Sequence, residues 1–335
     1  MKITVIIPVY NAARWLEAAV LSVLRQTGIE QEVIAIDDGA TDSSGTILDE
    51  LARQDARVRV FHQANAGQGA ARNHGLEQAT GDYVYFMDAD DELGASDALA
   101  RSAQEMAREQ LDLLFFDAET RMDPGVDVAS GILRADDYIR HHDYSGVYTG
   151  RELFAKMLRH REFCVSPCLM ILRRSFIEKH HLRFPAERIF YEDNIFMTRV
   201  LLAAERAGHR PWRLYVRKVH AGSTVTSKPT LRHLRGYLAC YRDAESLIAR
   251  GGWNWRTRAA LSERRAVYKL HVRRLADAWP NLVSELKNTG AAEEYAELQR
   301  ILVYPLSEKI CNAVRCLRDR GLAFTIRRIL FGRQG

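Results

Sequence analysis

No segment of the sequence approaches the roughly 20 consecutive apolar residues that are needed to span a lipid bilayer. The first residues, MKITVIIP, hold one lysine and a short apolar run that ends in proline, which is too brief for a secretory signal peptide. We therefore expect a buried first strand here, and a cytoplasmic protein. The sequence also has no internal repeat of about 20–50 residues and no low-complexity tract, which argues against repeat architectures.

The five cysteines are scattered, and their number is odd. Because no export signal precedes them, we expect reduced, buried thiols rather than disulfides. Cys164 and Cys168 stand close together, but no neighbouring pair of Cys or His residues completes a zinc-binding pattern. The other three are Cys240, Cys311 and Cys316.

The composition is that of an ordinary globular protein, with 47% hydrophobic and 27% charged residues. Its 335 residues leave room for two folded units, at roughly 100–200 residues per domain. The net charge of +5 is unevenly distributed, because 21 Lys and Arg stand against 10 Asp and Glu from residue 228 onward. The first 227 residues therefore carry a net charge of −6. This asymmetry predicts an acidic catalytic body and a basic tail that contacts an anionic partner.

The first ~120 residues alternate between strand and helix patterns, which is typical of an α/β fold with a mostly parallel sheet flanked by helices. The expected strands are Ile3–Val9, Val33–Ile36, Val58–Phe61, Tyr83–Met87 and Leu113–Phe116. The expected helices are Trp15–Arg25, Gly45–Arg53, Gly69–Ala79 and Asp97–Arg108. Residues 122–145 resemble a loop, weaker strand and helix signals follow up to residue 227, and the remainder is predicted to be helical.

Acidic residues follow the second and fourth expected strands, where ligands bind in open α/β sheets. The segment Asp88-Ala89-Asp90-Asp91 brings three carboxylates together, and their mutual repulsion requires compensation. Mn²⁺ or Mg²⁺ would supply it, and could bridge two phosphates and neutralise the charge on a departing diphosphate. The alternative is a solvated acidic turn that caps the following helix.

Four segments together carry a family resemblance. They are VIIPVYNAARWLEAAVLSVLRQT, VIAIDDGATDSSG, NAGQGAARNHGLEQATGDYVYFMDADDEL and FYEDNIF. In this order they resemble the family-2 glycosyltransferases of the GT-A fold. The resemblance is strong over residues 1–95, moderate to about residue 226, and absent beyond.

The resemblance implies that the ends of the first two strands hold the nucleotide. The corresponding residues here are Pro8, Tyr10, Asn11 and Asp38. The Asp38 carboxylate could accept the imide N–H of uracil, since an ionised carboxylate only accepts hydrogen bonds. Tyr10 could stack on the base, although an aromatic residue at a strand end is as often part of the core.

Asn65 through Arg72 resembles the family's glycine-rich segment, in which an arginine contacts the nucleotide or diphosphate. Gly67 and Gly69 would let the backbone pass close to a ligand. Arg72 falls in the first turn of a predicted helix, where the helix N-terminus favours anions. The alternative is that Arg72 forms a salt bridge to the acidic edge of the sheet.

For the acidic segment, the resemblance implies that Asp88 and Ala89 contact the nucleotide sugar and that Asp90 ligates the metal. Asp91 would be a second metal contact or an orienting neighbour. His220 falls where relatives often place a histidine or arginine near the leaving diphosphate. It could therefore ligate the metal or donate a hydrogen bond to phosphate, or it could be an ordinary loop histidine.

The Glu192-Asp193 pair matches the family's Glu-Asp motif. Inverting transferases need a general base that removes the proton of the acceptor hydroxyl. We assign this role to Asp193 and expect Glu192 to orient it or to bind the acceptor. Taken alone, two acidic residues at the start of a helix would merely complement the helix dipole.

The sequence thus predicts a metal-dependent inverting transferase that uses a nucleoside-diphosphate sugar, with UDP favoured, and a saccharide or polyprenyl-linked saccharide acceptor. The predicted GT-A domain covers residues 1–227, with 1–120 as its nucleotide-sugar-binding half and 121–227 as its acceptor-binding half. Two alternatives remain. One is a sugar nucleotidyltransferase, and the other is a non-catalytic sugar-nucleotide-binding protein.

The basic region 228–335 lies outside the resemblance, and three interpretations remain open for it. It could be a helical cap with a solvated basic face, a homo-oligomer interface, or an attachment to anionic lipid at the inner face of the plasma membrane. Nucleic-acid binding is not expected, because no recognised motif for it occurs. The lipid interpretation rests on apolar residues that alternate with arginines, namely Ile310, Val314, Leu317, Phe324, Ile326, Ile329, Leu330 and Phe331.

Overall fold

The computed structural model describes residues 1–123, 136–220 and 228–302. The chain divides into two compact units, the first of which is Met1–Tyr268, while the second begins at Lys269. The domain boundary near residue 227 that the charge distribution suggests stays a prediction. The apolar and basic residues of the C-terminal segment from Ile310 to Phe331, together with Cys311 and Cys316, lie outside the described residues.

Eight strands of the described chain form one mixed sheet in the order β3-β2-β1-β4-β7-β6-β8-β5. Strands β3, β2, β1 and β4 run parallel, whereas β7 is antiparallel to both β4 and β6. On the far side of β7, strands β6 and β8 are parallel to each other, and β5 at the edge is antiparallel to β8. The α/β fold expected from the sequence is confirmed. The strands are β1 (Lys2–Val9), β2 (Glu30–Asp37), β3 (Val58–His62), β4 (Tyr83–Phe86), β5 (Glu92–Leu93), β6 (Leu113–Met122), β7 (Met170–Arg173) and β8 (Ala207–Val219).

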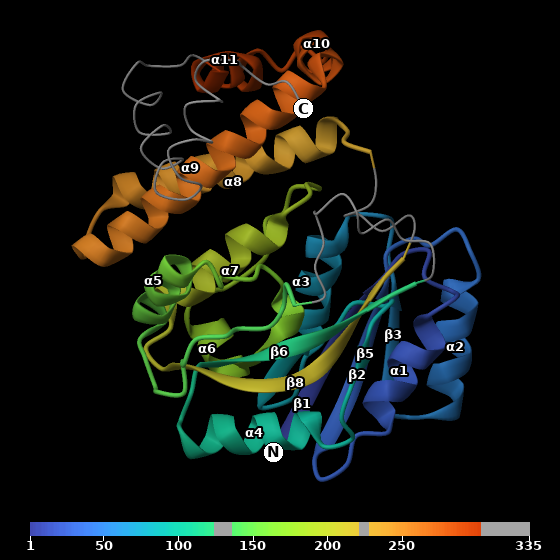
Figure 1. Cartoon of the computed structure of the whole chain (residues 1–335). Helices are drawn as coiled ribbons and strands as arrows, with labels where there is room; N and C mark the ends of the chain where they lie inside the picture. The colour runs from blue at the N-terminus through green and yellow to red at the C-terminus, as the bar shows by residue number, and fades with distance from the viewer. Residues whose placement is uncertain (124–135, 221–227, 303–335) are drawn as a thin grey trace. The chain divides into compact units, whose positions relative to one another are not determined.

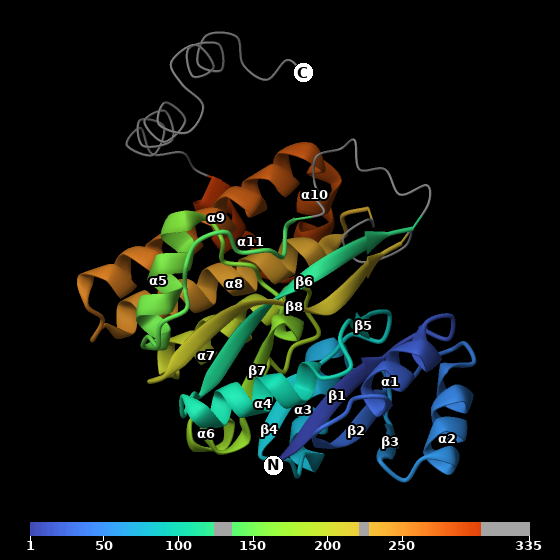
Figure 2. The same cartoon turned by 60° about the horizontal axis from the view of Figure 1, so that its bottom comes forward.

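Helices cover both faces of the sheet, and successive strand residues pack on opposite faces. Val5 and Ile7 of β1 belong to one buried cluster, whereas Ile6 belongs to the other. The first face packs against α1 (Leu16–Leu24), α2 (Ser44–Gln54) and α4 (Ala98–Arg108). The second packs against α3 (Gln68–Gln78), α5 (Gly150–His160), α6 (Arg174–Lys179) and α7 (Glu192–Ala203). The two sets of helices can be followed in Figure 1 and Figure 2.

The described chain from residue 228 onward is helical, as the sequence predicts. Helix α8 (Leu231–Arg250) packs on α7 through a cluster that includes Ile195, Cys240 and Ala244. In the second unit, buried leucines join α10 (Pro280–Asn288) to α11 (Ala292–Leu302). Helix α9 (Trp255–Ala278) is divided between the two units: its residues up to Tyr268 belong to the first unit, and those from Lys269 onward belong to the second. Within the described ranges, no helix combines the length and the apolar character that a membrane crossing requires.

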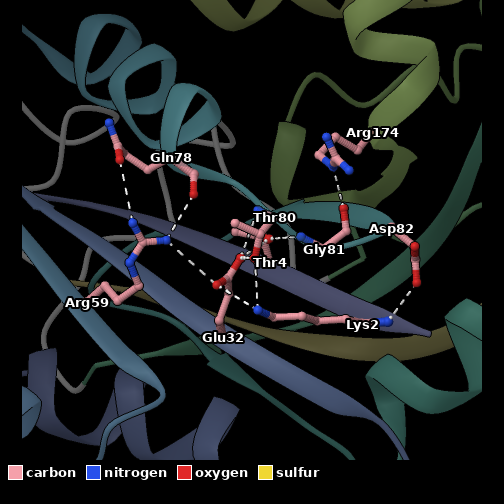
Figure 3. Close-up of polar contacts among 9 residues, drawn as sticks. All are labelled: Lys2, Thr4, Glu32, Arg59, Gln78, Thr80, Gly81, Asp82 and Arg174. Atoms are coloured by element: carbon pink, nitrogen blue, oxygen red, sulfur yellow. Dashed lines mark hydrogen bonds and ion pairs between the residues drawn. The ribbon is translucent and has the colours of Figure 1, made fainter.

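A buried carboxylate stabilises the amino-terminal end of the parallel strands, away from their carboxyl ends (Figure 3). Glu32 of β2 accepts hydrogen bonds from Thr4 Oγ1 at 2.6 Å, Lys2 Nζ at 2.9 Å and the Thr80 backbone N–H at 2.9 Å. Burial opposes the charge of Glu32, but these donors outweigh burial and lower its pKa to about 2. Glu32 therefore stabilises the fold in its ionised form.

Glu32→Gln should lower the free energy of unfolding at pH 7 by about 2 kcal/mol, since the folded-state pKa lies below the ordinary value. The stabilisation by Glu32 is present above about pH 4.5 and is lost as the pH falls towards 2. Urea unfolding of both proteins between pH 7 and pH 3 measures this, and the difference should shrink on acidification. Glu30→Gln, at the exposed start of β2, is the matched control and should match the wild type. A difference that does not depend on pH would contradict this prediction.

Candidate active site

The parallel strands β1, β2 and β4 are neighbours, so the residues that follow their carboxyl ends lie at one edge of the sheet. Tyr10 and Asn11 follow β1, Asp38 follows β2, and Asp88 lies shortly after β4. Val9 pairs with Asp37, and the Met87 backbone N–H donates to the Ile6 carbonyl. The candidate residues from the first half of the chain are thus brought together, as the order of parallel strands predicts.

The turn after β1 presents one aromatic ring to solvent. Pro8 is buried within β1, whereas Tyr10 is 50% exposed and is therefore accessible to a planar ligand. Asn11 has a positive φ of 52°, and its Oδ1 accepts a hydrogen bond from the Thr41 backbone N–H at 2.8 Å. Asn11 thereby joins the turn after β1 to the turn after β2. The exposure of Tyr10 excludes the alternative that its ring is part of the core, and stacking on the base stays a prediction.

Asp38 connects the β2 turn to the glycine-containing segment around Asn65. Its carboxylate is buried and accepts the backbone N–H groups of Ala66 at 2.7 Å and Gly67 at 2.8 Å, together with Gln63 Nε2 at 2.8 Å. A carboxylate offers about four acceptor positions, so one further donor can still be accommodated. Asp38 thus has a structural task, and its contact with a nucleotide base stays a prediction.

Arg72 is buried and joins α3 to two acidic elements. Its Nη2 lies 2.9 Å from Asp88 Oδ1 and its Nη1 lies 3.1 Å from Glu192 Oε1. The salt bridge considered as an alternative from the sequence is therefore present, and Arg72 connects the end of β4 with the start of α7. A Cβ at Gly69 would approach Glu192 Cγ to 3.1 Å and Phe184 Cβ to 3.2 Å. A side chain at this position would therefore push these neighbours by a few tenths of an ångström, so the protein's own packing favours glycine here.

Asp90 and His220 form a pair that fits a divalent cation. Asp90 Oδ2 lies 2.9 Å from His220 Nε2, and the imidazole stacks on Trp15 with ring centroids 4.0 Å apart. Burial and the nearby Asp88 charge raise the pKa of Asp90, so its carboxylate lacks sufficient positive charge around it. Carboxylate oxygen and imidazole nitrogen are ligands that Mn²⁺ accepts, whereas Mg²⁺ prefers oxygen alone. The Asp90 carboxylate and the His220 imidazole therefore fit Mn²⁺ as ligands, and the carboxylate also fits Mg²⁺.

Asp91 differs from Asp90 because β8 already occupies both of its carboxylate oxygens. Oδ1 accepts the Lys218 backbone N–H at 2.6 Å, and Oδ2 accepts the Tyr215 hydroxyl. The side chain is buried, and burial together with the Asp90 and Asp88 charges raises its pKa. The sequence left two roles open for Asp91, a second metal contact or an orienting neighbour, and this arrangement favours the second. Ala89, between the two acidic residues at 88 and 90, is buried.

Glu192 and Asp193 begin α7, directly after Tyr191, whose backbone is left-handed with φ 68°. Glu192 is buried, and burial followed by the Asp193 charge raises its pKa to about 7 against the opposing influence of Arg72. Burial also raises the pKa of Asp193, whose Oδ1 accepts the backbone and side-chain N–H groups of Asn194 at 2.8 and 3.1 Å. Both groups have the raised proton affinity that suits proton transfer near neutral pH.

The model of the glycosyl transferase family 2 matches residues 4–180, which is more than half of the chain. The chain belongs to glycosyl transferase family 2. This confirms the family resemblance; the matched range contains the first three sequence segments, while FYEDNIF at residues 190–196 lies beyond it. Curated relatives include the uncharacterized glycosyltransferase YibD of Escherichia coli, 32% identical over 73% of this chain and 71% of its own length. The uncharacterized EpsJ of Bacillus subtilis is 30% identical over 70% of this chain, and the match spans 66% of EpsJ.

Solved structures share the GT-A fold with this family-2 chain. TarS 1-349 of S. aureus, in complex with UDP-GlcNAc, matches 99% of the chain and 93% of its own length, with a TM-score of 0.66 and 19% identity. The mannosyltransferase PcManGT from Pyrobaculum calidifontis, in complex with GDP-Man and Mn²⁺, matches 98% of the chain and 84% of its own length, with a TM-score of 0.55 and 18% identity. At this identity the likeness concerns the fold.

Three site residues of this family-2 chain were not predicted from the sequence. Trp15 supports His220, although its position at the start of a helix gives no sign of this. Arg264 Nη2 donates to Asn194 Oδ1 at 2.5 Å, and the Tyr268 hydroxyl donates to the same atom at 3.2 Å. Both lie on α9, beyond the region of family resemblance. They orient the amide that donates to Asp193, so helices after residue 228 help to position the candidate base.

Proposed function

We propose that this chain is a metal-dependent, inverting glycosyltransferase that moves a sugar from a nucleoside-diphosphate sugar, with UDP as the favoured nucleotide, to a hydroxyl of a saccharide or lipid-linked saccharide. One observation carries the proposal. The buried guanidinium group of Arg72 contacts both Asp88 and Glu192, so the end of β4 and the start of α7 meet at this side chain. This supports a single site that combines the proposed donor-binding side with the proposed proton-accepting side.

The donor side contains the residues that follow β1, β2 and β4. Tyr10 offers an exposed ring to the base, and Asp38 has one acceptor position left for the imide N–H. Asn11 and Asn65 belong to the turns that flank this position. Asp90 and His220 would hold Mn²⁺ or Mg²⁺, which would supply positive charge to stabilise the departing diphosphate. Asp91 would hold the acidic segment against β8.

On the other side, Asp193 would take the proton of the acceptor hydroxyl while that oxygen attacks the anomeric carbon. A new C–O bond forms, the bond from the anomeric carbon to the diphosphate oxygen breaks, and attack from the opposite face inverts the centre. Arg72 and Asn194 would keep Glu192 and Asp193 in place. Two fold relatives support this donor chemistry, because TarS is complexed with UDP-GlcNAc and PcManGT with GDP-Man and Mn²⁺.

Product analysis tests the reaction type. With UDP- and GDP-sugars and Mn²⁺, the proposal expects a free nucleoside diphosphate, released by transfer or by slow hydrolysis of the donor. Release of pyrophosphate from a nucleoside triphosphate and a sugar phosphate would instead support a nucleotidyltransferase. Donor binding without either product would support a binding protein. A panel of nucleotide sugars in a thermal-shift screen selects the donor to use, since a bound ligand raises the melting temperature.

Attachment to an anionic membrane surface remains a separate prediction from the basic C-terminal composition. Flotation of the full chain with vesicles measures it. The prediction expects binding to vesicles that contain anionic lipid, weaker binding at high salt, and little binding to neutral vesicles. Equal recovery with both kinds of vesicle would contradict it.

A further inference from the structure

A second group of ligand-type side chains lies outside the residues assigned to the donor and the acceptor. His142 precedes α5, His160 is the last residue of α5, and Glu162 follows two residues later. One ligand atom from each of the three lies within 4.8 Å of the other two. In the described part of the chain, this is the one group of three or more His, Cys, Asp or Glu side chains that converges so closely.

The hydrogen bonds around Glu162 fix both imidazoles. Its Oε1 lies 2.8 Å from His142 Nδ1, and its Oε2 accepts the Tyr144 hydroxyl at 2.7 Å. The same hydroxyl lies 3.0 Å from His160 Nδ1. Because the single hydroxyl proton goes to the carboxylate, His160 Nδ1–H must donate to Tyr144, and His142 Nδ1–H must donate to Glu162. Each neutral ring then keeps its lone pair on Nε2.

The two imidazole rings are stacked, with centroids 3.9 Å apart and planes inclined by 21°. The stacking holds the two rings next to each other, and a neutral imidazole is the form that binds metal. Glu162 is held from the other side by the His141 backbone N–H at 3.0 Å. The three side chains are thus held close together by the protein before any ion binds.

We propose that His142, His160 and Glu162 form a binding site for one Zn²⁺-class cation. Two imidazoles and a carboxylate are a common zinc ligand set, and bonds of about 2.0–2.1 Å place tetrahedral ligand atoms roughly 3.4 Å apart. Small side-chain rotations bring the three groups to that spacing, and water completes the coordination. To bind the cation through the ring atoms that now face Glu162 and Tyr144, each imidazole gives up its Nδ1 proton and carries a proton on Nε2 instead.

Two cationic side chains lie near the site and oppose a further positive charge. Arg159 Nη2 is 3.4 Å from His160 Nε2, and Lys156 Nζ is 5.3 Å from the centroid of the Tyr144 ring. Arg159 is exposed and has a long side chain, so its head group can turn into water. The negative charge of Glu162 remains within the ligand set and compensates half of the charge of the cation.

The site would stabilise the segment that leads into α5. Tyr144 is buried, and its ring packs edge-on against His209 with centroids 5.7 Å apart. His209 Nε2 lies 2.9 Å from Asp117 Oδ1, and Arg140 Nη1 lies 2.9 Å from the same oxygen. A cation at His142 and Glu162 would therefore fasten this buried polar network to the end of α5. The proposed role is structural and is independent of sugar transfer.

Metal binding by the full chain tests the proposal without an activity assay. The protein is stripped with EDTA, freed of chelator and titrated with Co²⁺ while the visible absorption bands are recorded, and Zn²⁺ is then added in competition. The wild type should bind one ion at this site. His142→Ala and His160→Ala should each weaken that binding by about 100-fold or more. His142 is exposed, so its replacement should leave the fold intact.

Two further variants make the result specific. His141→Ala removes the neighbouring exposed histidine and should bind Co²⁺ like the wild type. Asp90→Ala removes a ligand of the proposed donor-side cation and should retain binding at the His142 site. Zn²⁺ should also raise the melting temperature of the wild type more than that of His142→Ala. Co²⁺ binding that is unchanged when His142→Ala or His160→Ala is added to Asp90→Ala, or that disappears in Asp90→Ala alone, would overturn the proposal.

Discussion

Asp90→Ala should reduce sugar transfer by at least about 10³-fold, because the cation that stabilises the leaving diphosphate would lose a carboxylate ligand. A cation at such a position contributes several kcal/mol to transition-state stabilisation, and roughly 4 kcal/mol corresponds to this factor. The fold should persist. In the structure, Asp90 has a hydrogen bond to His220 and an unfavourable position beside Asp88, so its removal relieves repulsion. Initial rates with the selected donor and saturating Mn²⁺ measure the effect.

The matched control is Asp82→Ala, which removes an exposed aspartate at the amino-terminal end of β4. That variant should transfer sugar at the wild-type rate, apart from any loss of stability. Melting temperatures of both variants show whether the protein is folded under the assay conditions. Activity of Asp90→Ala within about tenfold of the wild type would refute its assignment as a metal ligand.

The second large effect is expected for Asp193→Asn, which keeps the shape of the side chain but removes its ability to accept a proton. General-base catalysis contributes about 10²–10⁴-fold to the rate, so the turnover number should decrease by a factor in this range. The affinity for donor and Mn²⁺ should stay within about twofold of the wild-type value. The combination separates the chemical step from binding. Single-turnover rates give the first quantity, and titration calorimetry with the nucleoside diphosphate gives the second.

Asp243→Asn is a suitable comparison for Asp193→Asn. Asp243 lies on α8 and pairs with Arg199 of α7 at 2.6 Å, so its replacement also perturbs a carboxylate close to α7. This variant should retain most of its turnover. If Asp193→Asn weakens donor binding as much as it slows transfer, the residue is part of the donor site, and the assignment as base is wrong.

The parallel half of the fold is readily predicted from the sequence, whereas the antiparallel half is not. Buried strands such as β1 and β4 are short apolar runs that turn residues delimit. By contrast, β8 has exposed positions in its middle, and β5 consists of Glu92 and Leu93 alone. Their places in the sheet depend on pairing with each other over a long sequence separation, and local patterns carry no information on that pairing.

The site shows a similar division. The ends of adjacent parallel strands must meet, so the proximity of Asn11, Asp38 and Asp88 follows from strand order alone. The buried bridge from Arg72 to Glu192 spans 120 residues and depends on how α7 packs against α3. The Asp91 hydrogen bonds to β8 likewise arise from tertiary packing. Such partners belong to the folded structure, and the spacing of residues in the sequence does not reveal them.

Titration calorimetry of UDP and GDP with the full chain, in Mn²⁺ and in EDTA, tests the central claim most directly. If a cation at Asp90 and His220 holds the diphosphate, one of these nucleotides should bind at least about tenfold more tightly in Mn²⁺ than in EDTA, and Asp90→Ala should lose this difference. Equal affinity of the wild type in Mn²⁺ and in EDTA, for a nucleotide that does bind, would contradict the account.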